Sequence, residues 1–176
     1  MSIPHTPVRR TPCRRPGANR RPRIDTGELD VARAFLGYQR HCVLKKAEGL
    51  TEEQLRRRLV GRGTSILGLV RHLAETERGW FRHHLAGGER PGEAEPGATV
   101  PLDRSAAEVL DDHRAAIEES DRAIEAAGDP EAFLAIPVDG HRMSLRRLLA
   151  HMTAETARHA GNTGVLRERI DGATGR

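Results

Sequence analysis

His151, Glu155 and His159 lie at successive four-residue steps near the end of the chain. In a helix this spacing places the three side chains on one face, one turn apart. An imidazole and a carboxylate one turn apart are close enough to share a single metal ion. Two ligands from one helix leave the coordination sphere incomplete, so a further ligand must come from a second helix.

His72 is the candidate for that further ligand. It stands among aliphatic residues in the run Leu69-Val70-Arg71-His72-Leu73-Ala74, where a histidine becomes partly buried. A buried neutral imidazole needs a polar partner. The same pattern therefore also fits a histidine that hydrogen-bonds a backbone carbonyl or the Glu155 carboxylate without any metal, and spacing alone favours that interpretation.

The other residues with chemical side chains are typical of structural positions. His83 and His84 lie near a predicted helix end, where histidines complement the helix dipole. Trp80 and Phe81 form an aromatic pair of the kind that fills the core of a bundle. The sequence contains no phosphate-cradling glycine loop, no nucleophile elbow and no HExxH pair.

Apolar residues recur at three- and four-residue steps in four long segments, which predicts four amphipathic helices. They cover about residues 28–48, 65–85, 105–128 and 144–170, with a short helix over about 51–59 and a long loop over 89–103. Only 3% of the residues are aromatic, and a core of Leu, Val, Ile and Ala suits packed helices. We therefore expect an all-α four-helix bundle.

Positive charge is concentrated in residues 1–25, which hold seven arginines and one aspartate. The rest of the chain carries a net charge of −2, since the total is +4. This Arg/Pro-rich leader has too few apolar residues to fold and is predicted to be disordered, with residues 26–176 forming one domain. The alternative is that the leader neutralises the phosphates of a nucleic acid or binds an acidic partner. Because no aromatic residues interleave its arginines, nucleic-acid binding is not expected.

Localisation is predicted from what the chain lacks. No 7–15-residue apolar run follows the arginines, and no stretch of about 20 apolar residues occurs. We expect a cytoplasmic protein that makes no membrane contact.

Its two cysteines, Cys13 and Cys42, are too few for a disulfide framework or a thiolate metal cage, so a metal site must use histidine and carboxylate.

Several separated motifs, in order, resemble the DinB superfamily, specifically its actinobacterial branch known as the DUF664 family. The resemblance extends over about residues 28–175 and leaves out only the leader. It is carried by the runs Phe35–Arg40, Gly63–Ala74, Glu77–Phe81, Glu155–Gly161 and Leu166–Gly172.

The resemblance implies a four-helix bundle that holds a divalent metal ion with His72, Glu155 and His159. That ion would be zinc, with nickel as the alternative, and the related branch works with the thiol cofactor mycothiol. His151 is then not the third ligand, and it either orients a ligand or faces solvent. Related bundles are often dimers, which makes a homodimer the expected assembly.

Two positions depart from the family pattern. Asn162 stands where the family usually has a second histidine after the last ligand, and no tryptophan accompanies the arginines Arg146 and Arg147. The predicted function is a metal-dependent enzyme that activates mycothiol or a similar small thiol toward a small electrophile, as a transferase or isomerase. The alternatives are a metal-dependent hydrolase that uses a bound water and a non-catalytic binding module.

Overall fold

The computed structural model describes residues 22–59, 63–92 and 99–174. Within these ranges the chain is helical and has no β-strand longer than an isolated bridge, as the all-α prediction requires. The helices are α1 (Glu28–Ala47), the short α2 (Glu52–Arg56), α3 (Ile66–Glu77), the π-helix η1 (Arg78–Leu85) that continues α3, α4 (Ala106–Ala127) and α5 (Leu145–Asp171). The predicted leader, residues 1–25, lies outside the described residues except for 22–25.

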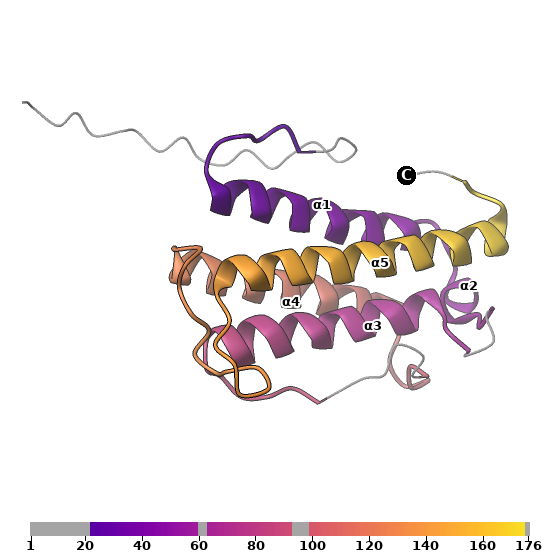
Figure 1. Ribbon diagram of the computed structural model, residues 1–176. Helices are drawn as coiled ribbons and strands as arrows, with labels where there is room; N and C mark the ends of the chain where they lie inside the picture. The colour runs from indigo at the N-terminus through magenta and orange to yellow at the C-terminus, as the bar shows by residue number, and fades with distance from the viewer. Residues whose placement is uncertain (1–21, 60–62, 93–98, 175–176) are drawn as a thin grey trace, which may run out of the picture.

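The four long helices form a bundle in which α1 and α5 run one way and α3 and α4 run the other way (Figure 1). Contacts at both ends fix the α1 and α5 pair. Arg146 pairs with Glu28 at one end, and Arg167 donates to the carbonyl of Lys46 at the other. Because α3 and α5 are antiparallel neighbours, residues late in α5 lie opposite residues early in α3.

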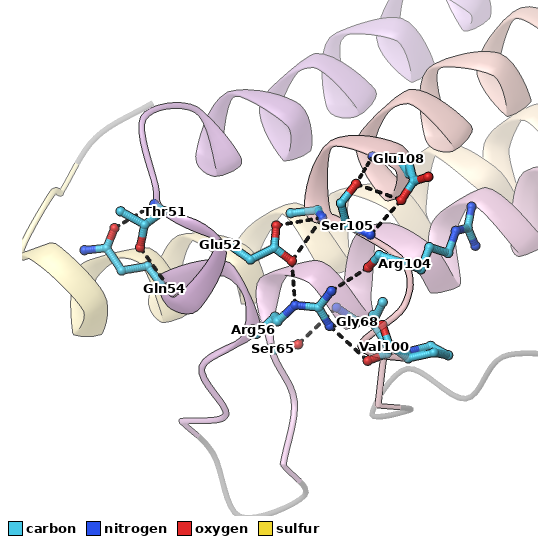
Figure 2. A network of polar contacts seen from close by, with 12 residues as sticks. Thr51, Glu52, Gln54, Arg56, Ser65, Gly68, Val100, Arg104, Ser105 and Glu108 are labelled. Atoms are coloured by element: carbon cyan, nitrogen blue, oxygen red, sulfur yellow. Dashed lines mark hydrogen bonds and ion pairs between the residues drawn. The ribbon is translucent and has the colours of Figure 1, made fainter.

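A polar network joins the short helix α2 to the start of α4 and to the segment before it (Figure 2). Glu52 accepts the backbone N–H of Ala106, the first residue of α4. Arg56 donates to the carbonyls of Val100 and Arg104, which precede that helix. These contacts satisfy backbone groups at the N-terminus of α4 and in the segment before it, and they hold α2 against that end of the helix.

The core consists of two hydrophobic clusters. One cluster surrounds the first half of α3, and the other surrounds η1 and the first half of α5. Buried polar side chains on all four helices lie between them, and we call this set the polar layer: Arg40, Glu77, His113, Thr156 and His159. Charged and hydrogen-bonding groups are therefore concentrated at mid-height in the bundle.

Two predicted elements differ from the structure. The helix expected over 65–85 is α-helical only to Glu77 and then continues as a π-helix, where the N–H of Ala86 donates to the carbonyl of Phe81, five residues earlier. The wider π turn is not encoded by apolar periodicity. The short helix ends at Arg56, three residues before the predicted Leu59.

No helix in residues 22–59, 63–92 and 99–174 is both long enough and apolar enough to cross a membrane.

Candidate metal centre

His72, Glu155 and His159 lie together between α3 and α5. Each offers one ligand atom, and the three atoms all lie within 4.8 Å of one another. The rings of His72 and His159 are 5.0 Å apart between centroids and meet at 66°. The Nε2 atom of His159 lies 2.9 Å from Oε1 of Glu155. The three residues that the sequence predicted as ligands therefore point at one small volume.

The helices that carry these side chains start at defined residues. Ser65 caps α3 by accepting the N–H of Gly68, and Ser144 caps α5 by accepting the N–H of Arg147. These caps satisfy N–H groups that have no partner within the helix. Between these two helices, the face of α5 that holds Glu155 and His159 meets His72.

Burial and charge hold Glu155 and His159 in the protonation states that bind metals. The hydrogen bond from Arg158, helped by one from His159, lowers the pKa of the Glu155 carboxyl. Burial lowers the pKa of the His159 imidazole, although its contact with Glu155 acts in the opposite direction. The carboxylate is thus anionic and the His159 imidazole neutral near pH 7, as metal coordination requires.

Two neighbouring residues support the site, and sequence reasoning missed both. The Thr76 hydroxyl donates to the backbone carbonyl of His72 and lies 3.5 Å from its Nε2 atom. Arg158 is 61% exposed and pairs with Glu155. The signal that could have found them is helical spacing, because Thr76 is four residues after His72 and Arg158 is three after Glu155.

The side chains present fit a divalent transition metal. Two imidazoles and one carboxylate are the donor set of open zinc sites, in which donor atoms about 2.1 Å from the ion lie about 3.4 Å from one another. The three atoms need only small shifts to reach that geometry from their present separations. Among the described residues, the buried Nδ1 atom of His159 has no hydrogen-bond partner, while the Nε2 atom of the same ring faces Glu155.

The remaining sequence candidates lie outside this triad. His151 is exposed, and its ring packs against Trp80. His83 and His84 lie in η1 and are hydrogen-bonded to backbone carbonyls of Gly88 and Ile136. Asn162 is exposed on α5. Trp80 is only partly buried, whereas Phe81 is fully buried, so the aromatic pair predicted as core is divided between core and periphery.

Comparison with known proteins places the chain in a family. A family model described as mycothiol-S-transferase matches residues 31–172. The chain belongs to the mycothiol-S-transferase family. The match covers every helix that carries a ligand of the triad, and it confirms the resemblance drawn from the motifs. The comparison with curated proteins found no match.

Members of this family share the DinB-like fold, and the structural comparison supports it here. The chain is similar to the crystal structure of a DinB-like protein from Bacillus cereus ATCC 10987, with a TM-score of 0.60 and 20% sequence identity. The likeness covers 80% of this chain and 93% of that one. At this identity it establishes the four-helix fold alone.

Proposed function

We propose that this member of the mycothiol-S-transferase family is a metal-dependent enzyme that transfers a small thiol, mycothiol, to a small electrophile. The observation that carries the proposal is the convergence of His72, Glu155 and His159, whose ligand atoms lie within 4.8 Å of one another. The proposed cofactor is one divalent ion, zinc or nickel. Membership of the family supports the thiol, and the chemistry of the donor set supports the metal.

The three side chains set the charge of the site. Glu155 contributes one negative charge, and the two imidazoles contribute none when they coordinate, so a site loaded with a divalent ion has a net charge of +1. That charge favours an anionic sulfur over a neutral one. Three protein ligands also leave coordination positions open for a small molecule, as catalytic sites require.

When bound, such an ion lowers the pKa of a thiol and favours its anionic form. The overall transfer forms a bond between sulfur and the electrophilic carbon. The bond from that carbon to its leaving group breaks, and the leaving group departs with the electron pair and is balanced by the thiol proton. His72, Glu155 and His159 would hold that ion and, through it, would fix where the sulfur binds.

The metal content of the purified protein tests the central step. We expect about one equivalent of metal in the wild type and a large loss in both His159→Ala and Glu155→Ala. His141→Ala is the matched control, because it removes an exposed histidine from the turn before α5. An equal, near-zero metal content in wild type, His159→Ala and Glu155→Ala would contradict the proposal.

Thiol dependence separates transfer from the alternative, hydrolysis by a bound water. The metal-loaded protein is offered a set of small electrophiles and esters with and without mycothiol, and products are identified by mass spectrometry. Thiol adducts that form only with both metal and mycothiol are the expected result. Hydrolysis at the same rate without thiol would replace the transferase with the hydrolase. The homodimer and the absence of nucleic-acid binding stay predictions.

A further inference from the structure

Beside the metal triad, three aromatic rings from two helices are in contact. The rings of Trp80 and His151 are 4.7 Å apart between centroids, and those of Trp80 and His84 are 5.2 Å apart. Trp80 and His84 come from η1, and His151 comes from α5. We call these three residues the ring strip.

The ring strip lies on the same two helix faces as the predicted metal ligands. His151 is four residues before Glu155, and Trp80 is eight residues after His72. Across the helices, Trp80 meets His151 just as His72 meets His159. At about 1.5 Å per residue, His151 lies about 6 Å before Glu155 along α5, and Trp80 lies about 12 Å after His72 along α3 and η1.

The π-helix explains how the strip stays aligned with the site. In an α-helix, residues four apart drift by about 40° around the axis at each step, so a continued α3 would turn His84 away from the face of His72. The wider turn of η1 reverses this drift over Arg78–Leu85. π-Helical turns are frequent at functional sites, and here the turn keeps Trp80 and His84 on the face of α3 that meets α5.

Core packing accounts for only part of the strip, because Trp80 packs against the second core cluster and also contacts both histidine rings. Phe81 is fully buried and fills the core at this level, whereas Trp80 and His84 are only partly buried and His151 is exposed. His84 is also held in place, because its Nδ1 atom lies 3.2 Å from the carbonyl of Ile136. A carbonyl only accepts, so Nδ1 carries the proton and Nε2 is left as an acceptor.

We propose that Trp80, His84 and His151 bind the portion of the thiol co-substrate that lies beyond its sulfur, and that this portion bears hydroxyl groups. The inference rests on the proposed function, since the triad places the sulfur. A hydroxyl both donates and accepts, which matches an imidazole acceptor at His84 and a second imidazole at His151. The indole of Trp80 supplies a flat apolar surface between them. The strip therefore selects among thiols, while the triad binds what all thiols share.

Trp80 is the only tryptophan in the sequence, so its fluorescence reports on the strip directly. Metal-loaded protein is titrated with mycothiol and, separately, with ethanethiol, which has a sulfur and no hydroxyl group. We expect a saturable change in emission with mycothiol and a much smaller one with ethanethiol. An equal change with both thiols at saturation would overturn the proposal.

Variants then separate recognition of the thiol from metal binding. In His151→Ala and Trp80→Phe, calorimetry should show about a tenfold weaker mycothiol affinity, the effect of one hydrogen bond or stacking contact, with ethanethiol affinity unchanged. Metal content should stay at the wild-type level in both variants. His141→Ala, an exposed histidine outside the strip, is the matched control and should change neither affinity.

The outcomes distinguish this inference from the proposed function. If both thiols bind and each variant weakens them equally, the strip does not select, and the inference fails while the metal-dependent function stands. If the protein carries metal but neither thiol binds, both fail. If the protein carries no metal, the proposed function is wrong. The inference about the strip then fails as well, because it depends on a sulfur bound at the metal.

Discussion

Two groups of charged side chains lie within the bundle, and they differ in how their bonding capacity is used. Arg40, 3% exposed, donates to both oxygens of Glu77 at 2.6 and 2.7 Å and to Asp121 at 2.8 Å. In the candidate metal centre, by contrast, His72, Glu155 and His159 aim ligand atoms at one volume. The charge of Arg40 is balanced by carboxylates of the same chain. The ligand atoms of His72, Glu155 and His159 present lone pairs that a bound cation would satisfy.

The difference teaches how to separate structural charge from functional charge in a helical bundle. A buried arginine with two carboxylate partners is neutralised where it stands, so it needs no ligand. Two imidazoles and a carboxylate that converge have more hydrogen-bond acceptors than donors, so they can bind a cation.

Four changes, ordered by expected effect, test this distinction between structural and functional charge.

The largest effect is expected from Arg40→Met. It leaves the carboxylate of Glu77, which is 1% exposed, buried without its main cation, and breaking a buried pair in this way costs about 3–5 kcal/mol. Urea denaturation measures the change in the free energy of unfolding. The double variant Arg40→Met/Glu77→Leu removes both charges and should recover most of the loss. A single-variant loss below about 1 kcal/mol would mean that the pair is not structural.

His113 should make the protein sensitive to acid. Burial and the charge of Arg40 lower the pKa of its imidazole to about 4, against about 6.5 in the unfolded chain. Between these values the unfolded state binds the extra proton, so the free energy of unfolding falls by about 1.4 kcal/mol for each pH unit of acidification, about 3 kcal/mol in all. Above pH 6.5 this contribution is fully present.

Replacement of His113 isolates that contribution from the carboxylates that titrate in the same range. Both ring nitrogens lack partners among the described residues, so His113→Leu should flatten the stability profile between pH 6.5 and 4 without loss at pH 7. Chemical denaturation at a series of pH values gives the profile. His141→Leu, at an exposed position, should leave the slope as in wild type. An unchanged slope in His113→Leu would assign the acid sensitivity elsewhere.

Metal should stabilise the triad region and leave the ion pair unaffected. With free zinc at 100 times its dissociation constant, the free energy of unfolding should rise by about 2.7 kcal/mol. Thermal unfolding with zinc and with a chelator measures the gain. It should vanish in His159→Ala and persist in Arg40→Met, whose substitution lies outside the triad. A gain of equal size in His159→Ala would place the metal elsewhere.

The smallest effect is expected from Arg114→Ala. Arg114 pairs with Asp111 on the surface of α4, and the two side chains are 53% and 73% exposed. Solvent screens such a pair, so the free energy of unfolding should change by less than about 0.5 kcal/mol. This variant sets the baseline for the comparison, because it removes an arginine ion pair without burial. A loss as large as that of Arg40→Met would mean that burial does not decide the cost.

Helix positions could be predicted from the sequence because their determinants are local. Ser105 and Glu108 cap each other at the start of α4, and Gly128 ends that helix with a positive φ of 65°. Glu155 and His159 were found by the same kind of argument, since a four-residue step defines one face of a helix, whereas His72 was a candidate because of its aliphatic neighbours. The resemblance to DinB-like proteins then selected among the open alternatives, and the family match supports it.

What the sequence by itself determined is the set of amphipathic helices, their caps and the two helix faces that carry His72, Glu155 and His159. The tertiary structure alone decided that Arg40 pairs with Glu77, 37 residues away, and that Trp80 packs against His151. It also decided the π turn that aligns the ring strip. The physical reason is range: caps and periodicity act within a few residues, whereas pairings between helices depend on how the whole bundle packs.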